Sequence, residues 1–319
     1  MHTDQAETTV IAHCGYGDDY RRLWRYRSGV EETIPIGLED GFHLYGDSDR
    51  TLVLICAMRR GEPWTVRPTS DVERIVASAT WDGGAWEFSG DSSVWSSLPR
   101  WVVVRQDKSE RAPDDVWLSE DADRSGLVQL APGPQPVDPL SWYWRGTYDH
   151  LYQGLHHPVA VPGTDLIVFG VQRSGELVLY DPAHRRVVRN VPLADRGGNP
   201  DPYMRRLRPE AWAIDYDTLV RVDVNTWQVV GKRKLQDPAP GLDRNFAGRL
   251  WFPFDEQFCL VARPFSGDVL IIDPLTLETV DAVAIGTQPL DAVIVGGQLV
   301  ARDWNPRTLH TAPLPPPRT

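Results

Sequence analysis

The sequence predicts an all-β protein built from repeated antiparallel sheets. Most of the chain alternates apolar and polar residues over short runs that are separated by Gly, Pro and Asp. Three segments with the same pattern align without gaps, and weaker copies recur along the chain. Few segments have a pattern that favours a helix, and the best candidate is GDDYRRLWRYRSG (17–29). We therefore expect a repeat protein of short strands with little helix.

The three clear repeats are ELVLYDPAHRRVV (176–188), TLVRVDVNTWQVV (218–230) and DVLIIDPLTLETV (268–280). Each is predicted to be a strand that ends at an Asp, followed by a tight turn and a second strand. Asp suits the start of such a turn because its carboxylate accepts hydrogen bonds from backbone N–H groups of the turn. The repeat therefore predicts a series of β-hairpins with a common register.

The spacing of the repeats predicts the size of the repeating unit. Equivalent positions in the clear and weak copies, from Cys56 to Asp303, are separated by about 41 residues on average. A four-stranded blade of a β-propeller needs about 40–45 residues. We therefore predict a single β-propeller domain over residues 1–319, with about seven four-stranded blades and six as the alternative.

Two blades are predicted strand by strand, over residues 157–193 and 249–286. The last blade has one strand too few, whereas TTVIAHC (8–14) forms a strand without a blade of its own. Because a ring of blades must pair its ends to remove exposed strand edges, we expect residues 8–14 to complete the last blade.

The segment VLIIDPLTLETVDAVAIGTQPLDAVIVGGQLVARD (269–303) resembles the repeats of bacterial YVTN-type, quinoprotein-like β-propellers. The resemblance covers residues 157–303 well and the first 150 residues poorly. It implies a propeller fold and no single activity, because such propellers bind and transform many different molecules. A quinoprotein-like redox role fits badly, since those propellers are usually exported and this chain shows no secretory signal.

Composition excludes several classes of function. The net charge of −11 opposes binding to nucleic acid, and no window approaches the ~18 apolar residues of a membrane helix. The start of the chain lacks a basic, apolar signal pattern, so we expect a cytoplasmic protein. Only three of 33 basic residues are Lys, which is typical of GC-rich bacterial coding sequences of the actinobacterial type. Three widely spaced cysteines indicate buried thiols rather than disulfides or a zinc site.

Sequence motifs for nucleotide binding, metalloprotease or serine hydrolase chemistry are absent. DADRSG (121–126) matches the first half of a calcium loop, but Pro132 stands where the last ligand should be, so a solvated turn is the better interpretation. We expect no metal ligands, and the sequence indicates no particular cofactor.

In propellers, ligands sit on the central axis, beside the loops that lead into the innermost strands. The segment SWYWRGTYDHLYQGLHH (141–157) is such a loop and is the densest in aromatic and His residues. Imidazole groups transfer protons near neutral pH, and aromatic walls make an apolar pocket. The candidate catalytic residues are therefore Tyr148, His150, His156 and His157, with Trp144 in the pocket wall. The alternative is that the aromatics pack between blades and the histidines are ordinary loop residues.

Arginines are the candidate anion-binding residues. Arg173 and Arg263 occupy nearly matching turns of the two clear blades, and Arg205, Arg206 and Arg208 follow in a neighbouring loop. Guanidinium groups bind carboxylates and phosphates through paired hydrogen bonds, so Arg173, Arg208 and Arg263 are predicted to bind substrate. The alternative is that these arginines are solvated and pair with nearby Asp residues.

Two functions follow from these interpretations. The first is a cytoplasmic, monomeric enzyme of small-molecule metabolism, a lyase, cyclase or hydrolase, with a small-molecule ligand on the propeller axis. The second is a non-catalytic propeller that binds a protein partner. A funnel lined by His, Tyr and Arg would favour the enzyme, and an apolar patch on the rim would favour the binding protein.

Overall fold

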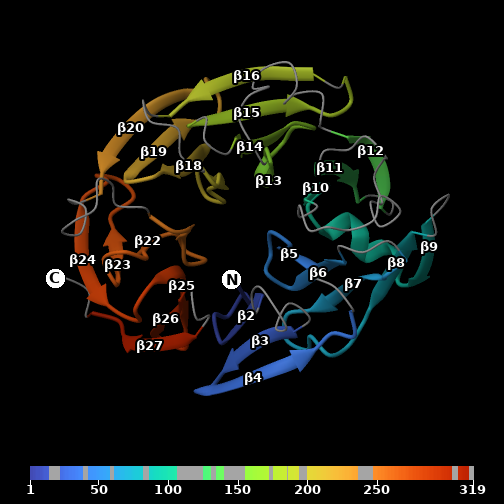
Figure 1. Ribbon diagram of the computed structural model, residues 1–319. Coiled ribbons are helices and arrows are strands. Elements are labelled where there is room, and N and C mark those ends of the chain that lie inside the picture. The colour runs from blue at the N-terminus through green and yellow to red at the C-terminus, as the bar shows by residue number, and fades with distance from the viewer. Residues whose placement is uncertain are drawn as a thin grey trace. The chain divides into compact units, whose positions relative to one another are not determined.

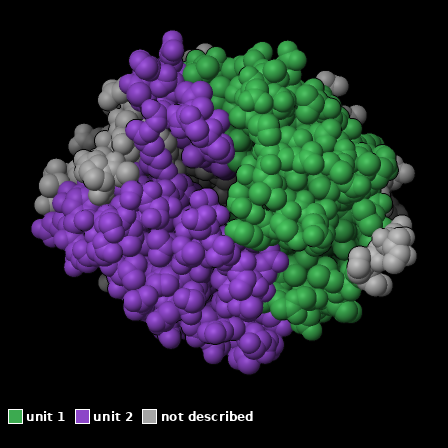
Figure 2. Space-filling model, turned by 180° about the vertical axis from the view of Figure 1, so that it is seen from behind, with its two compact units in different colours: residues 1, 168–179, 187–319 green, residues 2–167, 180–186 purple. Residues whose placement is uncertain are grey.

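A computed structural model of the 319-residue chain describes most of the predicted strands. The described residues are 1–13, 22–38, 42–57, 61–81, 86–105, 125–130, 134–139, 155–171, 175–184, 186–193, 200–235, 247–303 and 308–315. The chain forms two compact units, which Figure 2 shows in different colours. Unit 1 comprises Met1, Val168–Leu179 and Val187–Thr319. Unit 2 comprises His2–Ile167 and Tyr180–Arg186.

The described strands form seven antiparallel sheets, each made of strands that follow one another in the chain (Figure 1). We call them sheets A to G in chain order. Sheet A consists of β1 (His2–Thr3), β2 (Thr9–His13), β3 (Arg22–Arg27) and β4 (Val30–Pro35). Sheet B consists of β5 (Phe42–Gly46), β6 (Leu52–Ala57), β7 (Trp64–Pro68), β8 (Ala77–Trp81) and β9 (Trp86–Gly90). A short 3₁₀-helix, η2 (Ser92–Ser97), follows sheet B. Sheet C consists of β10 (Trp101–Arg105), β11 (Ser125–Gln129) and β12 (Gln135–Pro139).

The second half of the chain continues in the same way. Sheet D consists of β13 (Leu155–Ala160), β14 (Ile167–Val171), β15 (Glu176–Asp181) and β16 (Arg186–Pro192). Sheet E consists of β17 (Tyr203–Met204), β18 (Glu210–Asp215), β19 (Thr218–Asp223) and β20 (Gln228–Lys234). Sheet F consists of β21 (Leu250–Trp251), β22 (Cys259–Arg263), β23 (Asp268–Ile272) and β24 (Thr279–Ala284). Sheet G consists of β25 (Pro289–Val295), β26 (Gln298–Asp303) and β27 (Leu309–Pro313).

Consecutive up-and-down sheets of this kind are the repeating unit of a β-propeller. Sheets D and F contain the strands that the sequence predicted for residues 157–193 and 249–286. The Asp turns are confirmed as well. Asp181 accepts a hydrogen bond from the backbone N–H of His184, and Asp223 accepts one from Thr226. Asp273 accepts bonds from the N–H groups of two turn residues that follow it.

Two sequence-based expectations are wrong. The strand within residues 8–14 pairs with β1 and β3, so it belongs to sheet A and does not complete the last sheet. Its partner β1 has only two residues, which is too short for a sequence pattern to reveal. The expected helix at 17–29 is also corrected. Its described part begins at residue 22 and forms β3 and the start of the turn to β4. β3 pairs with β2 on one side and with β4 on the other, and its Leu23 and Tyr26 side chains are buried.

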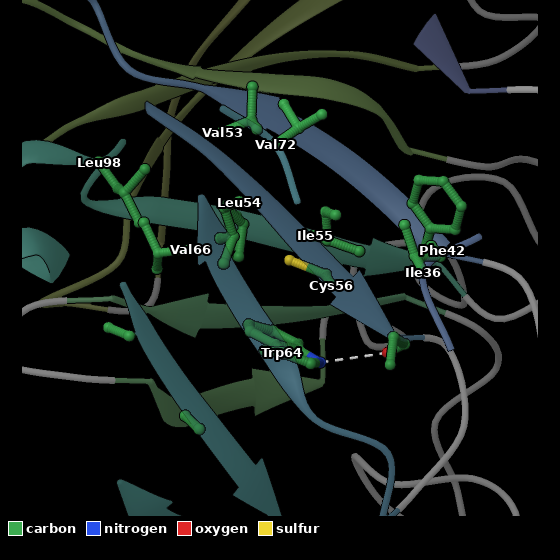
Figure 3. Close-up of a cluster of buried hydrophobic side chains, with 14 of the residues drawn as sticks. Ile36, Phe42, Val53, Leu54, Ile55, Cys56, Trp64, Val66, Val72 and Leu98 are labelled. Carbon is green, nitrogen blue, oxygen red and sulfur yellow. Dashed lines mark hydrogen bonds between the residues drawn. The ribbon is translucent and has the colours of Figure 1, made fainter. Parts of the chain in front are cut away.

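Each unit has its own hydrophobic core. In unit 2, apolar residues of sheets A and B pack with those of η2 and β10, and Figure 3 shows part of this cluster around β6. The Trp64 indole N–H, buried in that core, donates to the Ala57 carbonyl at 3.1 Å. In unit 1, Trp212 and Phe252 pack edge to face, with ring centroids 5.1 Å apart. Cys56 and Cys259 are buried in the two cores as free thiols, and burial raises the pKa of both.

Candidate functional site

The structure describes only part of the site that the sequence predicted. Trp144, Tyr148, His150 and Arg173 lie outside the described residues. His156 and His157 lie in β13, so the backbone there is already a strand rather than part of the preceding loop. The roles predicted for these residues in catalysis and substrate binding stay predictions.

Arg263 is buried at the end of β22 and binds a carboxylate of its own hairpin. Its Nε donates to Asp268 Oδ1 at 2.7 Å, and its Nη2 donates to Asp268 Oδ2. The two residues stand opposite each other in the β22–β23 register, so the pair closes the hairpin. This pairing uses the fork of the guanidinium that a substrate carboxylate would use. The role predicted for Arg263 in substrate binding therefore has a competitor within the chain.

The other arginines of the predicted site that the structure describes lie between β17 and β18. Arg208 is exposed, and its carbonyl accepts a hydrogen bond from the Glu210 N–H at 2.8 Å. Arg205, in contrast, is buried and donates to Glu256 at 3.1 Å and to Glu210 at 2.9 Å. Its guanidinium also lies over the Phe252 ring, 5.2 Å from the centroid.

Glu256 completes this network. Besides Arg205, it accepts hydrogen bonds from the backbone N–H groups of Arg206, at 2.6 Å, and Leu207, at 3.2 Å. A loop of sheet F is thereby fixed to a loop of sheet E. Arg205 and Glu256 are thus a buried ion pair whose two charges are both compensated within unit 1. The pair therefore has a structural role.

A group of charged residues in unit 1 lies at the start of β25, and we call it the Asp291 cluster. It consists of Asp201, Arg249, Asp291 and Arg302, with the amino group of Met1 3.9 Å from Asp291. The Asp291 and Arg302 side chains are each 3% exposed, and an Arg302 Nη2 to Asp291 Oδ2 hydrogen bond joins them. Arg249 Nε lies 3.4 Å from Asp201 and 3.7 Å from Asp291.

Local backbone structure positions these side chains. Asp291 and Arg302 are register partners in the hairpin β25–β26, whose turn is Gly296-Gly297. Gly248 lets the chain before Arg249 approach β25, because a Cβ there would stand 2.1 Å from the Leu290 carbonyl oxygen. The N–H of Arg249 then donates to that oxygen at 2.9 Å.

The electrostatics of the Asp291 cluster favour a permanent ion pair. Burial by itself raises the pKa of Asp291, but the charges of the amino terminus, Arg302 and Arg249 outweigh burial and bring its pKa well below the usual value. A carboxylate that stays ionised in this way is a weak base. Arg249, at 40% exposure, is the most accessible member, yet its charge already lies between two carboxylates. The cluster therefore has the properties of a structural ion-pair network.

Asp303, Thr287 and His310 are also close together, near the end of β26. Asp303 Oδ2 accepts hydrogen bonds from the N–H and the hydroxyl of Thr287, at 3.0 and 2.7 Å, and lies 3.1 Å from His310 Nε2. In a catalytic triad the hydroxyl would bind the imidazole, and the imidazole would bind the carboxylate. Here the hydroxyl and the imidazole bind the same carboxylate. The arrangement fixes the turn before β25 and does not activate Thr287.

A different kind of surface lies on β20, the outer strand of sheet E (Figure 1). Burial alternates along this strand, and its exposed positions are Gln228, Val230, Lys232 and Lys234. We call these four residues the β20 strip. Val230 is 51% exposed and lies at a β-bulge, because the pairing with β19 passes from Gly231 directly to Val229. The strip therefore combines an exposed apolar side chain with two cationic side chains on an outer strand.

Sequence reasoning missed both the Asp291 cluster and the β20 strip. A signal exists for each. An Asp within the apolar run PLDAVIV needs a buried partner, and the Gly296-Gly297 turn brings Arg302 opposite it, given a bulge. For the strip, the signal is that Lys232 and Lys234 are two of only three lysines in the chain.

The described part of the chain has neither a cluster of metal ligands nor a membrane-spanning helix. No three His, Cys, Asp or Glu side chains there are grouped as ligands for a metal ion. The described ranges also hold no helix that is long and apolar enough to cross a membrane.

Comparison with known proteins supports the fold. The sequence matches no protein-family model and no curated protein. The structure is similar to the β-propeller domain of Myceliophteria thermophila Cps50 (Swd1), with a TM-score of 0.54 and 10% identity over 99% of this chain and 98% of that one. It also resembles Kuenenia stuttgartiensis hydrazine synthase, with 17% identity and a TM-score of 0.39, over 49% of this chain and 45% of that one. The protein has an all-β, β-propeller fold.

Proposed function

We propose that this protein is a non-catalytic β-propeller that binds another protein. The observation that carries the proposal is the use of the buried charged groups in unit 1. Arg205, Arg263, Asp291 and Asp303 are each bound to partners within the unit, where they hold hairpins or loops in place. The described surface offers, in addition, an exposed outer strand with apolar and charged side chains.

The chemistry of the surface is consistent with a protein partner. Exposed apolar side chains occur on the outer strands β16 and β20, where Val188 is 46% and Val230 is 51% exposed. The net charge of −11 disfavours nucleic acid as the partner. The β-propeller domain of Cps50 shares the fold with this chain, and the likeness extends to the fold alone.

The enzyme remains the alternative. It rests on acid–base groups and anion-binding groups. The acid–base groups are Tyr148, His150, His156 and His157, and the anion-binding groups are Arg173, Arg208 and Arg263. No observation on the described residues favours it.

The proposal is tested with the protein purified from its own cells at native abundance. We expect it to elute in size-exclusion chromatography with light scattering at a mass well above its own 35.9 kDa, with a second protein in fixed stoichiometry. A parallel thermal-shift screen of metabolites gives the enzyme a fair test. A lone monomer that a metabolite stabilises, and whose turnover is lost in His157→Ala, would overturn the proposal in favour of the enzyme.

A further inference from the structure

The outer edge of sheet E has no strand partner among the described residues. β20 pairs with β19 from Gln228 to Lys234, with a bulge at Val230, and it is the last strand in the order of sheet E. At seven residues it is as long as any described strand. An edge strand of this length presents a row of backbone N–H and C=O groups, which another extended chain pairs with.

The charge of this edge is the reverse of the charge of the chain. Lys232, Arg233 and Lys234 are consecutive in a protein of net charge −11. Two other outer strands carry acidic residues, Glu31 and Glu32 on β4 and Asp281 on β24, whereas β16 carries Arg186 and Arg189. β20 is therefore a local cationic edge.

The three cations of β20 differ in their surroundings. Arg233 donates to Glu278 at 2.6 Å, on the opposite face from the β20 strip. Lys234 lies 4.0 Å from Asp217, and both are partly exposed to solvent. The ammonium group of Lys232 has no ion-pair partner in the described part of the chain. Two ammonium groups on one face, with little compensation, are available to an incoming anion.

Lysines also occur on edge strands as a protection against aggregation. The bulge at Val230 is a further device of that kind, and it leaves the Val230 side chain 51% exposed beside the two lysines. The two explanations differ in what they predict. A protective edge rejects every extended chain, whereas a recognition edge binds a chain of complementary charge.

We propose that the β20 strip binds an extended acidic segment of a partner protein, which adds to sheet E as a further strand. Because side chains repeat on one face every second residue, carboxylates at alternate positions of that segment face Lys232 and Lys234. An apolar side chain further along that segment packs against Val230 at the bulge. This inference rests on the proposed function, since it names the surface and the chemistry of the partner.

A synthetic peptide tests the inference directly. In an antiparallel pairing, the labelled peptide Glu-Thr-Glu-Thr-Val-Thr, blocked at both ends, places its two carboxylates opposite Lys234 and Lys232 and its Val beside the bulge at Val230. Binding to the full chain is measured by fluorescence anisotropy at low ionic strength. We expect Lys232→Glu/Lys234→Glu to weaken binding about tenfold or more. The same variant is expected to bind the peptide with Lys in place of Glu.

Two controls separate strand addition from general attraction between charges. Arg27→Glu/Arg74→Glu makes the same change in net charge at exposed positions outside β20, and we expect it to bind the acidic peptide as the wild type does. The second control is the peptide with methyl groups on alternate backbone nitrogens, which removes the N–H donors that face β20. It should lose most of its binding.

The inference is overturned if the two double variants weaken binding equally, or if the methylated peptide binds as well as the parent. Either outcome leaves the proposed function standing. Purification of the native complex distinguishes failure of the inference from failure of the proposed function. If a stoichiometric partner stays bound to Lys232→Glu/Lys234→Glu, the protein is a binding propeller that uses another surface. If no partner exists, the proposed function fails whatever the peptide does.

Discussion

The Asp291 cluster and the β20 strip both concentrate charge in unit 1, but they place that charge in opposite environments. Asp291 and Arg302 are almost completely buried and compensate each other, whereas Lys232 and Lys234 are exposed on an outer strand. A buried ion that loses its partner destabilises the fold strongly, while an exposed ion contributes little to it. We conclude that charge at the start of β25 serves stability and that charge on β20 is available for binding.

The largest effect on stability is expected from Asp291→Asn. The substitution leaves Arg302 buried without a compensating charge, so the free energy of unfolding should fall by about 3–5 kcal/mol. Urea denaturation measures the loss. The double variant Asp291→Asn/Arg302→Met is the control, because removal of both charges should cost less than the sum of the single changes. Additive losses, or a loss below about 1 kcal/mol, would show that the cluster does not act as a pair.

A smaller effect is expected from Glu256→Gln, which keeps the shape of the side chain but removes its charge. The carboxylate of Glu256 accepts bonds from Arg205 and from two backbone N–H groups. Hydrogen bonds to charged groups contribute about 1.5–3 kcal/mol, and we expect a loss in that range. Glu210→Gln is the matched control. Glu210 also binds Arg205 but is more exposed than Glu256, so Glu210→Gln should lower the free energy of unfolding by less than Glu256→Gln does. Equal losses would contradict a special role for Glu256.

The next effect concerns pH. Burial raises the pKa of Asp303, but hydrogen bonds from Thr287 and Gln288 and the charge of His310 outweigh it, so the pKa is lowered. A group with a lowered folded-state pKa stabilises the protein above its unfolded pKa of about 3.9, and this contribution is lost as the pH falls further. Asp303→Asn should therefore cost about 1–2 kcal/mol at pH 7 and less at pH 3. Denaturation at both pH values measures this. A cost that does not change with pH would contradict the interpretation.

The sequence predicted those parts of the fold that depend on local signals. The turns at Asp181, Asp223 and Asp273 were predicted because a carboxylate and the N–H groups it binds lie within three residues. The strand at 8–14 was also predicted, but its neighbours were not. A pattern of alternating residues indicates that a strand exists, whereas its pairing depends on β1 and β3.

The candidate site was less predictable than the fold. The Asp291–Arg302 pair lies within one hairpin, but no local pattern links it to positions 201 and 249, which complete the cluster. Arg205 was noted in the sequence as part of an arginine-rich loop. Its partner Glu256 is fifty-one residues away in the sequence, so the sequence alone indicated a possible site for an external anion. In the structure, the chain itself supplies that anion.

The smallest effect on stability is expected at the other end of the comparison, on β20. Lys232→Glu/Lys234→Glu reverses two charges that lie on the exposed face of an outer strand, and its one described ion pair, with Asp217, is 4.0 Å long and exposed to solvent. Substitutions of this kind usually change the free energy of unfolding by no more than about 0.5 kcal/mol. Urea denaturation beside Asp291→Asn should therefore show a nearly wild-type midpoint for the lysine variant and a large shift for the aspartate variant. A loss above about 2 kcal/mol in the lysine variant would mean that the strip is part of the structural framework, and the contrast between the two regions would not hold. A small loss, together with weaker peptide binding, would show that these charges serve recognition rather than the fold.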